Sequence, residues 1–96
     1  NNPVLKQAAD LEIKGDFAAA ATLLKQALDA NLQSPEVHHR LGLTLVNLGQ
    51  TSEALSELRI ASALDPANKT FADDLARVLR IHQRSLTSGS GSGEGQ

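Results

Sequence analysis

Residues 35–68 read PEVHHRLGLTLVNLGQTSEALSELRIASALDPAN, and this stretch decides the fold. Its apolar residues recur three and four positions apart, which is the spacing of one face of an α-helix. Pro35 suits the first turn of a helix, and Gly49 interrupts the pattern near its middle. The stretch therefore predicts two helices joined by a tight turn.

The same spacing extends outward from Val4 to Leu86, and no segment alternates as a half-buried strand would. Breaker residues at positions 15–16, 31–35, 49–51 and 65–68 divide this length of chain. We expect helices over roughly residues 3–14, 17–30, 35–48, 52–64 and 69–86. The predicted fold class is all-α, built from short antiparallel helical hairpins.

The residues at these boundaries favour helix ends. Gly15 and Gly49 can adopt the left-handed conformation that closes a helix. Asp16, Ser34 and Thr51 have side-chain oxygens that can accept hydrogen bonds from the first backbone N–H groups of the next helix. Each turn is thus expected to join an ended helix to a capped one.

A shift of the sequence against itself by 34 residues superposes identical residues at the spacing of one structural unit. The superposed pairs are Leu11 and Leu45, Gly15 and Gly49, Ala20 and Ala54, Leu24 and Leu58, and Ala27 and Ala61. We therefore predict one domain over residues 1–86, with repeat 1 at 1–34, repeat 2 at 35–68, and the first helix of a third unit at 69–86 as a cap.

Residues 87–96 read TSGSGSGEGQ and carry no apolar side chain that could be buried. Alternating Gly and Ser gives the backbone great freedom, so we expect a disordered linker here. Its regularity is typical of an expression linker rather than of natural sequence.

Composition excludes several classes of function. The formal net charge is −2 and the pI is about 5.8, with no cluster of Lys and Arg for nucleic acid. No run approaches the ~18 apolar residues of a membrane span, so we expect a soluble chain without membrane insertion. The chain has no Cys, which excludes disulfides and thiolate metal sites. The compartment stays open, with the cytoplasm favoured.

A helix–turn–helix unit of 34 residues with this order of small and large side chains resembles the tetratricopeptide repeat (TPR). Repeat 2 matches the family's signature at Leu41, Gly42, Leu45, Gly49, Ala54, Leu58, Ala61 and Pro66. The resemblance extends over residues 1 to about 84 and implies an α-hairpin solenoid. Val4, His38 and Ala72 stand where the family usually has a large aromatic residue, which predicts a marginally stable domain.

The resemblance implies a protein-interaction module, a scaffold or adaptor that binds a short peptide or helix in a concave groove. The first helix of each repeat would line this groove. Those positions are Leu5, Lys6, Ala9, Glu12, Ile13, His39, Arg40, Leu43, Val46, Asn47, Thr70, Asp73, Asp74, Arg77, Arg80 and Ile81. Among them, Leu5, Ala9, Leu43 and Val46 would form an apolar strip facing solvent, although small domains also expose some Leu and Val without any function.

One TPR subgroup grips the acidic tails of chaperones with a clamp of Lys, Asn and Arg side chains. The equivalent positions here hold Leu5, Ala9, Arg40, Thr70 and Asp74. We therefore predict that this chain does not bind chaperone tails.

An alternative function is structural self-association. The helix predicted at 69–86 carries Phe71, Leu75, Val78, Leu79 and Ile81, which is more apolar surface than one neighbouring helix covers. A homodimer through this terminal helix would cover the remainder.

An enzymatic function is the least favoured. His38 and His39 are adjacent on a helix, so their side chains diverge by about 100° and do not converge on a metal ion. We expect His38 to be a packing residue between repeats and His39 to point toward the groove. No phosphate-binding loop, metalloprotease motif or paired nucleophile and base occurs. The sequence predicts no catalytic residues, no cofactor and no metal site.

Overall fold

The computed structural model describes residues 3–30 and 34–94, with residues 87–94 described as backbone only. This part of the chain consists of helices and turns without strands. The helices are α1 (Pro3–Ile13), α2 (Phe17–Asp29), α3 (Pro35–Asn47), α4 (Thr51–Leu64) and α5 (Lys69–Glu94). The predicted all-α repeat fold is confirmed, and four helix starts match the predicted residues.

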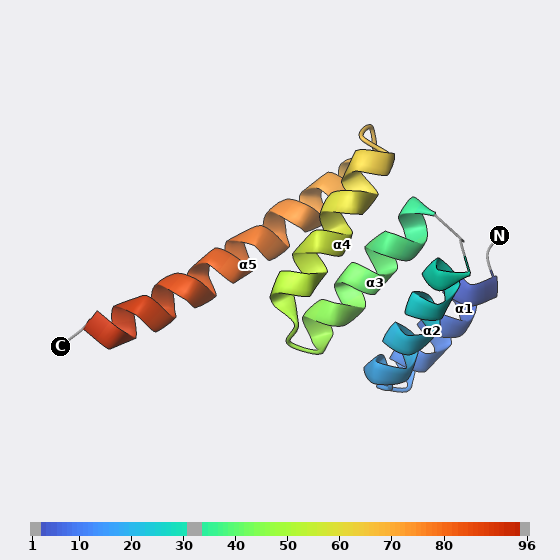
Figure 1. The fold of residues 1–96 in the computed structure, drawn as a ribbon, viewed down its shortest axis with the longest axis horizontal. Helices are drawn as coiled ribbons and strands as arrows, with labels where there is room; N and C mark the ends of the chain where they lie inside the picture. The colour runs from blue at the N-terminus through green and yellow to red at the C-terminus, as the bar shows by residue number, and fades with distance from the viewer. Residues whose placement is uncertain (1–2, 31–33, 95–96) are drawn as a thin grey trace.

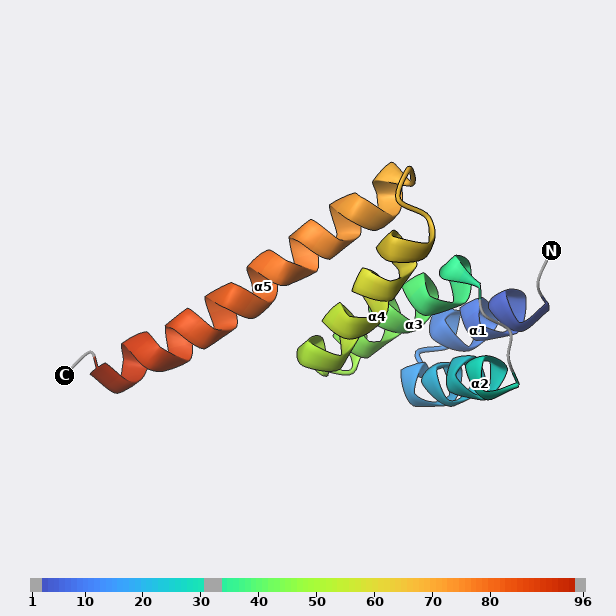
Figure 2. The same ribbon diagram turned by 45° about the horizontal axis from the view of Figure 1, so that its top comes forward.

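Consecutive helices pack against each other in a row (Figure 1). α1 and α2 form one hairpin, α3 and α4 form the next, and α5 packs on α4. α1 also contacts α3, so the first helices of the two hairpins are neighbours. Figure 2 shows the same row with α5 extending well past the end of α4.

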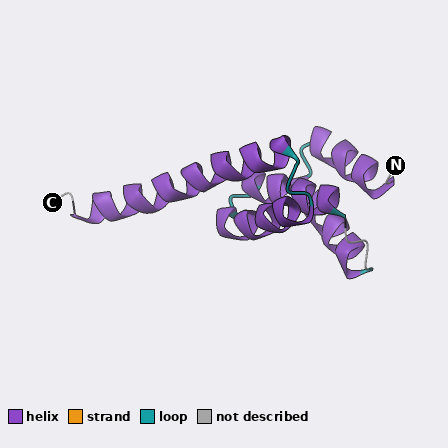
Figure 3. Ribbon diagram, turned by 90° about the horizontal axis from the view of Figure 1, so that it is seen from above, coloured by secondary structure: helices purple, strands orange, loops and turns teal. Residues whose placement is uncertain are grey.

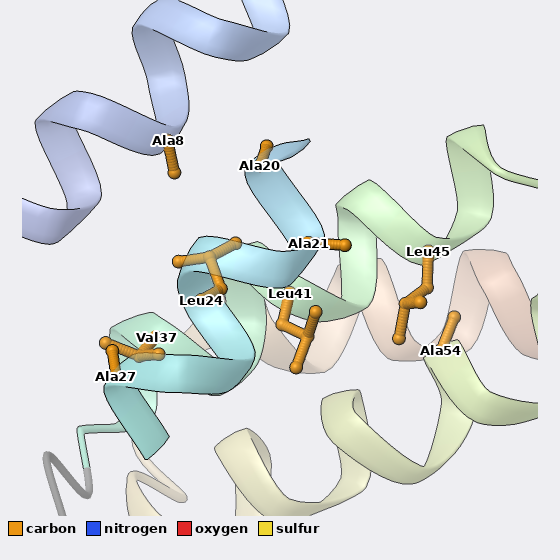
Figure 4. Packing of buried hydrophobic residues seen from close by; sticks show 9 residues of the cluster. All are labelled: Ala8, Ala20, Ala21, Leu24, Ala27, Val37, Leu41, Leu45 and Ala54. Carbon is orange, nitrogen blue, oxygen red and sulfur yellow. The ribbon is translucent and has the colours of Figure 1, made fainter. Parts of the chain in front are cut away.

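The core is made almost wholly of Ala and Leu. One buried cluster joins the first four helices and contains Ala8, Ala20, Ala21, Leu24, Ala27, Val37, Leu41, Leu45 and Ala54 (Figure 4). A second cluster joins α4 and α5 through Leu55, Leu58 and Val78. Small Ala side chains let helices approach closely, while each fully buried Leu contributes about 1.5–3 kcal/mol.

The turns follow the predicted chemistry with one exception. Gly15 and Gly49 have φ of 84° and 79°, a conformation that costs other residues about 1–2 kcal/mol. The Asp16 carboxylate accepts a hydrogen bond from the Ala19 N–H at 3.2 Å and so caps α2. The prediction that Thr51 caps α4 is wrong, because Thr51 already lies in the helix and Gln50 precedes it without a side-chain cap.

Ser34 caps α3 as predicted, since its hydroxyl oxygen accepts a hydrogen bond from the Val37 N–H at 3.3 Å. The same hydroxyl donates to the Glu36 carboxylate at 2.7 Å, and this bond lowers the pKa of Glu36. Because the pKa of Glu36 is lower in the folded state than in the unfolded chain, its ionised carboxylate stabilises the fold at neutral pH. This contribution is lost as the pH falls through the lowered pKa.

Gly42 marks the closest approach of α3 to α4. A Cβ atom on Gly42 would lie 2.7 Å from Cγ of Leu58 and 3.2 Å from the backbone oxygen of Ala54. We expect Gly42→Ala to lower the free energy of unfolding by about 1 kcal/mol, because an overpacking cost of about 1–3 kcal/mol exceeds a gain of about 0.8–1 in helix propensity. Urea unfolding of this variant measures the difference, and a stabilised protein would contradict the contact.

The C-terminal part of α5 differs from the prediction. We expected the helix to end at residue 86 and a disordered linker to follow, but α5 continues to Glu94. A helix that is already nucleated gains one hydrogen bond for each residue added, and residues 87–94 contain no Pro to stop it. Residues 95–96 lie outside the described residues. The domain limits at 1–86 and the linker's origin stay predictions.

Candidate protein-binding face

The candidate face is formed by the first helices α1, α3 and α5. Figure 3, seen from above, places α1 and α5 along one side of the molecule, with α2 toward the opposite side. Polar side chains from α1, α3 and α5 meet across the spaces between these helices. We call the surface that these three helices present the first-helix face.

Glu12 joins α1 to α3. Its Oε2 accepts a hydrogen bond from the Thr44 hydroxyl at 2.9 Å, and its Oε1 lies 3.4 Å from Nη1 of Arg40. The Thr44 hydroxyl also lies 2.8 Å from the backbone oxygen of Arg40 in its own helix. Thr44 is fully buried, so this pairing satisfies a polar group that would otherwise be costly there.

His39 joins α3 to α5. Its Nε2 lies 2.7 Å from Oδ2 of Asp74, and its ring stacks on Phe71 with a centroid distance of 4.5 Å. Arg77 donates to the other Asp74 oxygen at 2.6 Å. Asp74 is therefore engaged from both sides, and His39 fixes the beginning of α5 against α3.

His38 is buried as expected, and its hydrogen bond lies within repeat 2. Its role in packing between repeats stays a prediction. Its Nδ1 is 2.7 Å from Oε1 of Glu57 in α4, while its Nε2 has no hydrogen-bond partner among the described residues. His38 and His39 therefore reach different carboxylates on different helices. Within residues 3–30 and 34–94 no group of three metal-ligating side chains comes together.

The predicted apolar strip is less exposed than we expected. Leu5, Ala9, Leu43 and Val46 are all half-buried. Leu5 and Val46 pack against the cluster that joins the first four helices, and Leu43 and Val46 pack against the cluster between α4 and α5. These side chains therefore support the core with one side and leave only part of their surface free.

The remaining predicted positions occupy the rim of the face. Ile13 is 83% exposed at the end of α1, and the Asn47 amide donates to the Leu43 backbone oxygen of its own helix at 3.1 Å. Further exposed side chains are Lys6, Thr70, Asp73, Arg80 and Ile81. Five predicted residues make contacts between helices or beside those contacts: Glu12, His39, Arg40, Asp74 and Arg77. Among the described residues, no side-chain hydrogen bond or ion pair joins the rim residues to these five.

Sequence reasoning missed Thr44 and Phe71 as parts of this face. A usable signal was the separation of complementary residues by about one repeat length. Thr44 and Glu12 are 32 residues apart, and His39 and Asp74 are 35 residues apart. Residues at such separations occupy neighbouring positions in successive repeats, so polar pairs at this distance are candidates for contacts between first helices.

Among the described residues, no helix is both long enough and apolar enough to span a membrane.

Comparison with known proteins agrees with the architecture. The sequence profile described as "Tetratricopeptide repeat" matches residues 13–79. The chain is also 41% identical over 54 residues to the TPR repeat-containing protein PA4299 of Pseudomonas aeruginosa, a match that covers 56% of this chain and 22% of that protein. The matched segment thus spans about a fifth of its relative's length. With the profile covering most of the chain and the helical hairpins in place, this protein belongs to the tetratricopeptide repeat family.

Proposed function

We propose that this chain is a non-catalytic interaction module that binds a short extended or helical protein segment on its first-helix face. Tetratricopeptide repeats generally mediate protein–protein interaction, and the family consists of non-catalytic repeat scaffolds. A scaffold fixes the shape of a surface, while a few side chains on it select the partner. The choice of partner therefore depends on the charges and apolar groups that this face presents.

The observation that carries the proposal is the unequal exposure of paired charges on the face. The Arg40 side chain is 39% exposed while its partner Glu12 is 15% exposed. The Arg77 side chain is 58% exposed while Asp74 is 15% exposed. Both carboxylates are less exposed and also bond to a second helix, Glu12 to Thr44 and Asp74 to His39. The two guanidinium groups are therefore more accessible to a ligand than the carboxylates are.

A guanidinium group with free N–H donors binds carboxylates well, often through two parallel hydrogen bonds. Arg40 lies on α3 and Arg77 on α5, with half-buried Leu43 also on α3. We therefore propose a protein segment with acidic side chains near an apolar residue. The helices are already joined by Glu12 and His39, so little ordering entropy would be lost on binding.

Selection from a displayed peptide library, followed by fluorescence anisotropy on the selected peptides, tests this function. We expect Arg40→Ala combined with Arg77→Ala to weaken binding about tenfold, which is ~1.4 kcal/mol for two exposed pairs. Arg59→Ala is the matched control, because Arg59 is an exposed arginine on α4, away from the face. Equal affinities of the two variants, with helicity unchanged, would place the binding site elsewhere.

Self-association is the second candidate function, favoured by one observation on α5. Among residues 69–86 of this helix, only Phe71 and Val78 are buried, whereas Leu75 and Leu79 are half-buried and Ile81 and Leu86 are exposed. A homodimer that covers part of this helix would account for its apolar residues.

A further inference from the structure

One face of α5 is only partly covered in the structure. Four residues of α3 are buried: His38, Leu41, Gly42 and Leu45. His38 among them contacts Glu57 of α4, and Gly42 lies against Leu58 of α4.

Residues of α5 one repeat length later are less buried. These equivalents in α5 are Ala72 and Ala76, which are exposed, and Leu75 and Leu79, which are half-buried. The two leucines pack with one side against the cluster between α4 and α5, so the two alanines and the other sides of the leucines are uncovered. We call these four residues of α5 the open face. It has the shape of a surface that packs against a helix, since small residues alternate with leucines.

Two charged residues flank the open face along one edge. Asp73 and Arg80 are seven residues apart, which is close to two helical turns, so both lie on the same side of α5. Both side chains are exposed. Unlike Asp74 and Arg77, neither makes a hydrogen bond or ion pair with another described residue. Asp73 lies three residues before Ala76, and Arg80 lies three residues after Arg77. The two charges are therefore equally far from the midpoint between residues 76 and 77, and both are available to a partner.

We propose that the open face binds the open face of a second copy, with the two α5 helices antiparallel. This inference rests on the self-association proposed above and gives it a register. In a twofold dimer each residue meets the partner's residue at the same distance on the other side of the axis. With the axis between residues 76 and 77, Asp73 of each chain lies beside Arg80 of the other.

Packing agrees with this register. Ala76 lies at the crossing point, where a small side chain allows the two helices to approach closely. Leu79 of one chain lies next to Ala72 and Leu75 of the other, so a large side chain fits over a small one. Lys69 then lies opposite Arg84, but both are exposed, and water and salt screen such pairs.

The interface is small. A single helix pair buries less than the roughly 1,200–2,000 Å² of a stable complex, so the dimer is a weak one that forms at high protein concentration. Two reciprocal Asp–Arg pairs in such an interface decide orientation more than affinity. Charge reversal is therefore the most direct test of the register.

Sedimentation equilibrium on the full chain and on two charge-reversal variants tests the proposal. Asp73→Arg gives a chain with two basic residues at the edge, and Arg80→Asp gives a chain with two acidic ones. We expect each variant alone to dimerise at least tenfold more weakly than the unchanged chain. An equimolar mixture should recover pairing, because each basic edge then meets an acidic edge. Two variants that dimerise as well as the unchanged chain, or a mixture that fails to pair, would overturn the register.

Introduced cysteines provide an independent measurement, since the chain has none of its own. A disulfide needs Cα atoms about 4.4–6.8 Å apart. Ala76→Cys lies at the proposed axis and should cross-link in a glutathione redox buffer. The control Ala72→Cys lies on the same face, but its copies would be about 13 Å apart along the helices, at 1.5 Å per residue, and should not cross-link.

The outcomes separate this register from self-association itself. A dimer of the unchanged chain that cross-links through residue 72 instead of residue 76 would keep the second candidate function and overturn the register. A monomer at all concentrations would overturn both. Binding of the monomer to a peptide of residues 51–64, which contains the helix that covers α3, would show that the open face takes a repeat-type second helix instead of a second copy.

Discussion

Replacing Leu58 by Ala is expected to lower the free energy of unfolding by about 2–5 kcal/mol. Leu58 is fully buried and belongs to the cluster between α4 and α5, and it also touches Gly42 of α3. Its removal would open a cavity where three helices meet. Because a domain of this length has a total stability of about 5–10 kcal/mol, the variant loses a large share of it. Thermal unfolding followed by circular dichroism measures the change. At about 4–8 °C per kcal/mol, we expect Tm to fall by about 8 °C or more.

Ile60→Ala is the matched control for Leu58→Ala. Ile60 lies on the same helix and is 40% exposed. Its replacement by Ala removes an aliphatic side chain of the same size as Leu58. Because the Ile60 side chain is already partly in contact with water, its removal takes less buried apolar surface out of the fold. We expect the free energy of unfolding to fall by less than about 1 kcal/mol. Equal losses for the two variants would contradict the orientation of α4.

The helix limits could be predicted because their causes are local. The left-handed glycines Gly15 and Gly49, and the capping residues Asp16 and Ser34, act on the residues next to them in the sequence. Predicted and observed limits of the first four helices therefore agree to within one residue. The repeat period was also readable, because the crossing of helices demands small residues at fixed positions.

The contacts of the first-helix face could not be predicted in the same way. The stacking of His39 on Phe71 depends on how α5 lies against α3, and no local rule fixes that angle. The half-burial of Leu43 and Val46 has the same origin, since both pack against the cluster that α5 completes. Periodicity identified the helix face that these residues share but not how far the neighbouring helix covers it.

The end of α5 shows a different limit of sequence reasoning. Composition predicted disorder from residue 87, whereas the helix continues to Glu94. Gly is about 1 kcal/mol worse than Ala in a helix interior, so composition argues against a helix, while propagation from an established helix argues for one. The two effects are close in size, and composition alone does not decide between them.

Replacing Ala54 by Leu is expected to lower the free energy of unfolding by about 1–3 kcal/mol. Ala54 is fully buried, and its backbone oxygen would lie 3.2 Å from a Cβ atom on Gly42, so α3 and α4 leave no room for a larger side chain there. A leucine would force the two helices apart or adopt a strained rotamer. Since both hairpins use an Ala at this position of the repeat, Ala20→Leu should have a similar effect between α1 and α2.

Ala63→Leu gives the control for Ala54→Leu, because it makes the same substitution at an exposed position of α4. Leu and Ala differ little in helix propensity, so this variant should change the free energy of unfolding by less than about 0.5 kcal/mol. Urea unfolding of both variants, at equal slope, isolates the packing cost at residue 54. An Ala54→Leu protein as stable as Ala63→Leu would mean that α3 and α4 do not cross at Ala54, and the repeat register based on that crossing would be wrong.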